Sequence, residues 1–216
     1  MTVYDVARAL PAIPELRELC RALAVLDVVL SPGGTERRHG YAPDRDRASM
    51  EDGAGNEYSI VFTAAGAWVR GFDHESPMSP YATDDEEPWP GVLDAVPEAF
   101  RECLEEPDSA DESGTPVVTV CLWRGHGDTA WQHGDITFPR HGDDGADWLF
   151  LLLTEGTPEA YRDWAQDYFE TPVDLAAVRH VHAGRPLTAD VVTALNPATT
   201  LAAVAAEVAA IGYPTA

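Results

Sequence analysis

The spacing of the apolar residues changes twice along the chain, and no other feature of the sequence constrains the fold as strongly. Between residues 14 and 24 they recur at the three- and four-residue spacing of an amphipathic helix. Between 58 and 72 they alternate with polar residues in two runs separated by a turn, as in a β-hairpin. From 157 onward the helical spacing returns. The sequence therefore predicts an α+β fold with N-terminal helices, a central, mainly antiparallel sheet of about four to six strands, and a helical C-terminal third.

Local signals refine this prediction. The run 117–123 is almost continuously apolar and β-branched, which is typical of a strand buried on both faces. We expect a further strand within 129–138, one short strand within 35–56, and a short helix over 97–104. Thr157 and Thr188 have the position and residue type of helix N-caps. Five tryptophans fall within predicted strands or helices, so we expect them in the core: Trp68, Trp123, Trp131, Trp148 and Trp164.

The length allows one sizeable core. With 216 residues, of which 45% are hydrophobic, the chain is predicted to form a single α+β domain over 1–216. The Gly- and Asp-rich loop near 141–146 is the one place where a boundary is an alternative.

The charge excludes several classes of function. There are 37 acidic residues against 14 basic ones, all of them arginine, and the formal net charge is -23. Without lysine there is no Schiff-base chemistry and no phosphate-loop lysine. A chain this acidic repels phosphate backbones and anionic lipids, so we expect no nucleic-acid partner and no membrane partner. A basic protein partner is favoured.

The cellular compartment is predicted from missing targeting signals and from the cysteines. The first residues do not have a secretory signal pattern, and no apolar run approaches the length of a membrane span. The three cysteines, Cys20, Cys103 and Cys121, have no CxxC spacing and lie in apolar segments, as reduced core thiols do. We therefore expect a cytoplasmic protein.

The acids gather in one segment that is a candidate partner-binding surface. Between Asp84 and Glu112 there are 12 acidic residues and one arginine. Trp89 lies in a Pro-Trp-Pro-Gly turn beside them, and tryptophan next to charge is typical of binding hot spots. The alternative is a plain solvated face. The predicted partner-binding residues are Asp73, Glu75, Tyr81, Asp84, Asp85, Glu86, Glu87 and Trp89.

The loop that follows the predicted hairpin also carries titratable groups. His74 and Glu75 are candidates for acid and base catalysis, although no GxSxG nucleophile motif accompanies them. The alternatives for this loop are partner recognition or a rigid cap on the hairpin.

Two histidine patterns are candidates for a divalent metal. His180 and His182 would share one side of the chain if the segment were extended, and His74, Asp174 or Asp190 could then supply a third ligand. Three His-Gly-Asp triplets also lie between 126 and 143. Ordinary turn chemistry explains these triplets without an ion, so our primary expectation is no cofactor.

Part of the sequence resembles a known group of proteins. The segments 58–81, 121–124 and 147–188 are similar to an uncharacterised family of bacterial proteins that has no assigned activity. This resemblance implies a bacterial, single-unit protein and no mechanism. In charge and size alone, the chain is also similar to the small acidic immunity proteins of bacterial toxin systems.

These observations give three functional hypotheses. The first is a non-enzymatic acidic binding protein, such as an immunity or inhibitor protein that neutralises a basic partner. The second is a metal-dependent hydrolase that uses clustered histidines and carboxylates. The third is a structural or scaffold subunit in which the apolar stripe over 201–211 forms an oligomer seam. Of these hypotheses, the sequence favours a function that is not enzymatic.

Overall fold

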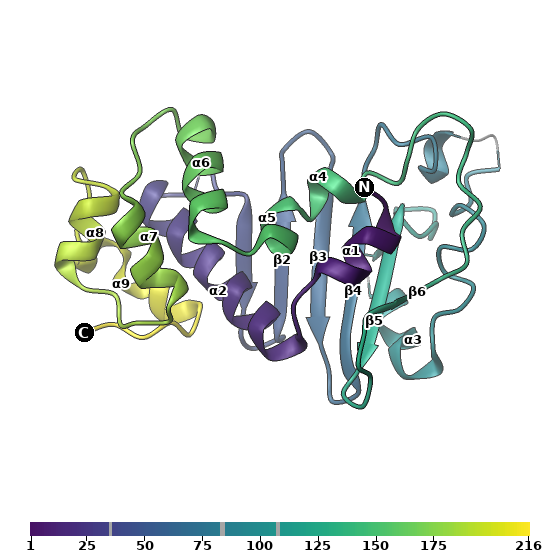
Figure 1. The fold of residues 1–216 in the computed structure, drawn as a ribbon, viewed down its shortest axis with the longest axis horizontal. Coiled ribbons are helices and arrows are strands. Elements are labelled where there is room, and N and C mark those ends of the chain that lie inside the picture. The colour runs from purple at the N-terminus through teal and green to yellow at the C-terminus, as the bar shows by residue number, and fades with distance from the viewer. Residues whose placement is uncertain (35, 83–84, 107–108) are drawn as a thin grey trace. The chain divides into compact units, whose positions relative to one another are not determined.

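The protein has an α+β architecture in which an antiparallel sheet is accompanied by helices from both ends of the chain (Figure 1). The computed structural model describes residues 1–34, 36–82, 85–106 and 109–216. The strands are β1 (His39–Ala42), β2 (Arg47–Glu51), β3 (Glu57–Phe62), β4 (Gly66–Phe72), β5 (Val120–Gly125) and β6 (Gln132–His133). Their order in the sheet is their order in the sequence.

Helices precede the sheet, interrupt it and make up most of the C-terminal third. They are α1 (Val3–Ala9), α2 (Ile13–Leu30), α3 (Arg101–Leu104), α4 (Ala146–Leu149), α5 (Leu151–Glu155), α6 (Pro158–Tyr168), α7 (Leu175–His182), α8 (Ala189–Leu195) and α9 (Leu201–Ala210), with 3-10 turns η1 (Pro80–Ala82) and η2 (Glu98–Phe100). The predicted fold class and its three-part order are confirmed.

The chain forms two compact units, each built from two stretches of sequence. Unit 1 consists of residues 1–13 and 49–154, and unit 2 consists of residues 14–48 and 155–216. The loop 141–146 lies within unit 1. The single domain over 1–216 stays a prediction.

Three long strands form the core of unit 1. β4 pairs with β3 on one side and with β5 on the other, both in antiparallel register. Trp68 lies opposite Trp123, and the next pair along the ladder is Val69 and Leu122. All four side chains are buried, so β4 and β5 are covered on both faces. The buried strand predicted over 117–123 is present as β5, which begins at Val120 and continues to Gly125.

The strand expected within 129–138 is shorter than predicted, because a tyrosine from α1 takes the place of a neighbouring strand. Only Gln132–His133 pairs with β5. Beyond it, the hydroxyl of Tyr4 donates to the carbonyl of Ile136 (3.0 Å) and accepts from its amide (2.8 Å). Helix α1 packs against β5, β6 and α4 (Figure 1), which brings Tyr4 to this backbone.

Unit 2 contains a run of helices and one buried carboxylate. α6 packs on α7, α7 on α8, and α8 on α9. Asp27 on α2 has no exposed surface. Its Oδ1 accepts from the Tyr161 hydroxyl (2.7 Å), and its Oδ2 accepts from the amides of Arg38 and His39 (2.9 and 2.8 Å). A buried carboxylate is tolerated when its oxygens are bonded in this way.

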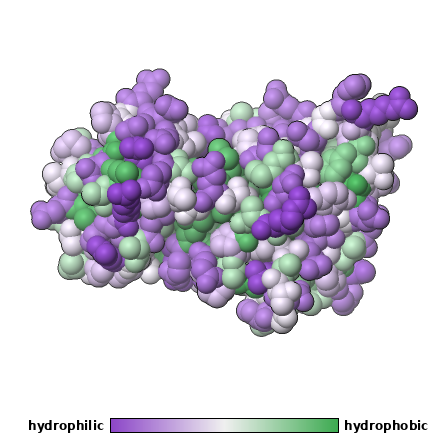
Figure 2. Space-filling model, in the orientation of Figure 1, coloured by the Kyte–Doolittle hydropathy of each residue, from purple (hydrophilic) through white to green (hydrophobic). Residues whose placement is uncertain are grey.

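Two local expectations need correction. The polar stretch 35–56 holds two strands, β1 and β2, where one was expected. Trp148, expected in the core, is 38% exposed, because α4 presents its outer side to solvent there. On the face shown in Figure 2 hydrophilic residues predominate, with small scattered apolar groups. Among the described helices, none has the length and apolarity needed to cross a membrane.

Candidate functional site

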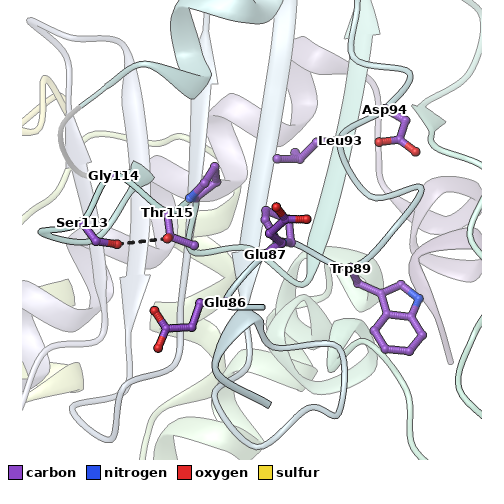
Figure 3. Close-up of a pocket in the computed structure, with 10 residues that line it drawn as sticks. Glu86, Glu87, Trp89, Leu93, Asp94, Ser113, Gly114 and Thr115 are labelled. Carbon is purple, nitrogen blue, oxygen red and sulfur yellow. Dashed lines mark hydrogen bonds between the residues drawn. The ribbon is translucent and has the colours of Figure 1, made fainter. Parts of the chain in front are cut away.

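A pocket of ≈ 470 Å³ opens in unit 1 between two loops of the acidic segment (Figure 3). Three of its residues are acidic: Glu86, Glu87 and Asp94. Its apolar walls are Pro88, Trp89, Leu93 and Pro116, and the turn 113–115 completes the lining. In Figure 3, Glu87 lies at the centre, with Glu86 and the turn on one side and Trp89, Leu93 and Asp94 on the other. We call this site the Trp89 pocket.

The position of Trp89 is set by a hydrogen bond and by an unusually close backbone contact. Its indole Nε1 donates to the carbonyl of Thr137 (3.0 Å), which orients the ring, and the residue is half-buried. A Cβ on Gly91 would lie 2.2 Å from the carbonyl oxygen of Asp135, and one on Gly134 would lie 1.7 Å from that of Gly91. Only glycine fits at these two positions, so the loop that carries Trp89 is held directly against residues 134–137.

The acidic residues of the pocket have no partner of opposite charge. Asp94 accepts from the amide of Gly91 through Oδ2 (3.0 Å), which stabilises the turn. Glu86 and Glu87 are exposed, and Glu86 has a positive φ of 50°. Within the described ranges, no ion pair involves any of these three carboxylates, although arginines neutralise acids elsewhere, as Arg70 does for Glu57 and Arg37 for Glu207. The pocket therefore carries a net negative charge that no described arginine neutralises through an ion pair.

A tyrosine and a tight turn form the adjoining wall. Tyr81 packs edge-on against Phe72, with ring centroids 5.9 Å apart, and its hydroxyl donates to Asp111 Oδ2 (3.2 Å). Asp111 Oδ1 accepts from the amides of Ser113 and Thr115 (2.9 and 3.0 Å), which closes the turn next to the pocket.

The contacts of Asp111 and Tyr81 shift the pKa values of these two residues in opposite directions. Hydrogen bonds from Ser113, followed by the bond from the Thr115 amide, lower the pKa of Asp111 against the opposing effect of desolvation. Desolvation raises the pKa of Tyr81, and the charges of Asp111 and Glu86 raise it further. Tyr81 is thus a neutral hydrogen-bond donor within an acidic surface, and 51% of its surface is exposed.

The predicted partner-binding residues divide into two groups. Tyr81, Glu86, Glu87 and Trp89 lie in or beside the Trp89 pocket, and Asp85 is exposed just before it. Asp84 lies outside the described residues. Asp73 is buried, and its carboxylate accepts from the Glu75 amide (2.9 Å) and from the Trp148 indole (3.0 Å). Glu75 is exposed.

The structure gives His74 a structural contact. It is exposed, and its backbone amide donates to Asn56 Oδ1 (2.9 Å). Its ring Nδ1 lies 2.7 Å from the same oxygen. Asn56 is fixed in turn by Asp52, whose Oδ2 accepts from Asn56 Nδ2 (2.7 Å). His74 thereby ties the loop after β4 to the β2–β3 turn.

His180 and His182 lie on helix α7, where residues two apart point in widely different directions. The extended arrangement on which their pairing as ligands depended is therefore not present. His180 Nε2 lies 2.9 Å from the Pro186 carbonyl. Burial lowers the pKa of His182 to about 4, although the charge of Glu159 opposes this shift. Within the described ranges, no three side chains of His, Cys, Asp or Glu gather closely enough to hold a metal ion.

Sequence reasoning missed the residues that complete the pocket. Leu93, Asp94 and Pro116 lie within or next to the acidic segment, but no local pattern indicates that they meet. Thr137, which orients Trp89, lies 48 residues away from it in the sequence. The acidic cluster indicated Glu86 and Glu87, and the Pro-Trp-Pro-Gly turn indicated Trp89, but neither signal indicated the other side of the pocket.

Comparisons with protein-family models, with curated proteins and with solved structures find no match to this chain.

Proposed function

We propose that this protein is a non-enzymatic binding protein that holds a basic segment of a partner protein in the Trp89 pocket. The observation that carries the proposal is the pocket itself, whose lining combines three carboxylates with an indole of fixed orientation, and within the described residues none of the three carboxylates forms an ion pair. Because opposite charges attract across an interface, a cationic segment would complement this surface. Trp89 and Tyr81 would supply the apolar contact area that carries most of the affinity at an interface.

The net charge of -23 fits the same proposal. Its field would accelerate encounter with a basic protein and would disfavour nucleic acids and anionic membranes. An immunity or inhibitor protein that neutralises a basic partner is the form of this function that we favour. We place it in the cytoplasm, since its three cysteines are buried and form no disulfide within the described residues, as is usual in a reducing compartment.

The test measures binding of a short, fluorescently labelled, lysine- and arginine-containing peptide by anisotropy at low and moderate salt. In the double variant Glu86→Gln/Glu87→Gln, we expect binding to weaken by about three- to tenfold, because two carboxylates next to the bound cation lose their charge. Moderate salt should weaken wild-type binding more than binding by this variant.

The matched control is Glu15→Gln/Glu155→Gln, which removes the same charge from two exposed residues of unit 2. We expect it to retain near-wild-type affinity. Equal losses in the two double variants would mean that only net charge attracts the peptide, and the pocket would then not be the site.

A further inference from the structure

The Trp89 pocket offers two kinds of surface to a bound side chain, and this combination distinguishes between basic residues. One kind is apolar and consists of the indole of Trp89 together with Pro88, Leu93 and Pro116. The other kind is anionic, and Glu86 and Glu87 contribute to it from adjacent positions. In Figure 3 the carboxylate of Glu87 lies between the indole and the 113–115 turn. A ligand that contacts both surfaces would therefore be apolar on one side and cationic on the other.

We infer that the pocket selects arginine over lysine as the anchoring side chain of its partner. This inference rests on the proposed function and names the ligand group of the same site. A guanidinium group is planar, stacks on an aromatic face, and presents parallel N–H donors to carboxylates. A lysine ammonium is a compact and strongly hydrated point charge, which gains less from an indole face.

Two features of the site support arginine in particular. The Trp89 ring is oriented through its Nε1–H and is partly exposed where it lines the pocket, so a planar group can stack on the exposed part with little change in the ring's rotamer. The volume of ≈ 470 Å³ lies within the range of small-ligand pockets, so an arginine and a neighbouring residue of the same segment fit together. The walls at Leu93 and Pro116 can then cover the aliphatic stem of the arginine.

The experiment uses three labelled peptides of the same length, which carry arginine, lysine or citrulline at the same positions. Citrulline keeps the shape of arginine and removes its charge. We expect the arginine peptide to bind about five- to tenfold more tightly than the lysine peptide, through stacking and paired hydrogen bonds. The citrulline peptide should bind more weakly than both.

Variants at Trp89 test the part played by the indole. Trp89→Ala should bring the two affinities close to equality, whereas Trp89→Phe keeps an aromatic face and should retain most of the preference. Trp148→Ala is the matched control, because it removes an exposed tryptophan of unit 1 that does not line the pocket and whose indole bonds to Asp73. Thermal unfolding of each variant shows whether it is folded.

The outcomes separate this inference from the proposed function. Equal binding of the arginine and lysine peptides, still weakened by Glu86→Gln/Glu87→Gln, overturns the arginine preference and leaves the binding function standing. An arginine preference that survives in folded Trp89→Ala also overturns it. Binding of neither peptide at low salt contradicts the proposed function itself.

Discussion

At the scale of single residues, Asp144 is the carboxylate with the most unusual surroundings in unit 1. Its side chain has no exposed surface, and its carboxylate contacts the first residues of two helices. Its Oδ2 accepts from the amide of Val3 in α1 (2.7 Å), and its Oδ1 accepts from the amide of Ala146 in α4 (3.1 Å). Burial raises the pKa of Asp144 to about 6, although these hydrogen bonds oppose the shift.

This environment predicts a pH dependence of stability. Because the pKa of Asp144 is higher in the folded state than its ordinary value of 3.8, the folded state binds the proton more tightly. The contribution of Asp144 to stability is therefore present below about pH 4 and is lost as the pH rises toward 6, by about 3 kcal/mol. Urea unfolding from pH 4 to pH 7 measures this change.

Asp144→Asn is the control for this prediction. It cannot ionise, so the stability of the wild type relative to this variant should fall across pH 4 to 6. The comparison cancels His182, whose lowered pKa acts in the opposite direction over an overlapping range. A difference between the two proteins that stays constant or grows with pH would contradict the assigned environment of Asp144.

Asp144 was not predicted from the sequence, and the reason is physical. It follows the His-Gly-Asp triplet at 141–143 and cannot be distinguished by residue type from the exposed Asp143 beside it. Its burial depends on the amide of Val3, 141 residues away. By contrast, the N-caps depend on neighbours in sequence and were predicted. Thr157 accepts from the amide of Ala160 (3.2 Å), and Thr188 accepts from that of Val191 (3.3 Å).

At the scale of elements, helix α6 ends in a conformation that its sequence does not favour. Glu170, just after the C-cap Phe169, has a φ of 50°, in the left-handed region where glycine is preferred. A residue with a Cβ in this conformation lowers the stability of the folded protein by about 1 kcal/mol.

Glu170→Gly should therefore stabilise the protein, by up to about 1 kcal/mol, because the relief of strain outweighs the added freedom of the unfolded chain. Asp167→Gly, an exposed position within α6, should instead destabilise it by roughly 0.5–1 kcal/mol. Urea unfolding at constant pH measures both variants. A loss of stability in Glu170→Gly would show that the Glu170 side chain makes a contribution larger than the strain.

The helices and strands that were predicted best are those whose apolar spacing alone indicates the type of element. The buried strand β5 and the capped helices α6 and α8 follow from local spacing. His180 and His182 lie in a short helix, whereas their interpretation as paired metal ligands assumed an extended segment. β6 is short because Tyr4 of α1 occupies the backbone beyond it, a contact that no local pattern contains.

At the scale of the whole molecule, the acidic surface was predicted from composition and the pocket was not. Counting charges was enough to locate the acidic segment 84–112, and the basic partner that it predicts stays a prediction. The cavity requires the loop that carries Trp89 to lie against residues 134–137, and it requires the 113–116 turn to close the other side. These contacts are long-range. Backbone segments approach each other closely at glycine residues, and the indole of Trp89 donates one hydrogen bond.

An NMR titration of the isotopically labelled protein with the arginine peptide at low salt locates the binding site residue by residue. We expect the amide shifts to concentrate at residues 86–94 and 113–116, together with the indole N–H of Trp89. Shifts that concentrate elsewhere, for example around Trp148 or in unit 2, or that spread evenly over the exposed acids, would contradict the claim that the Trp89 pocket is the binding site.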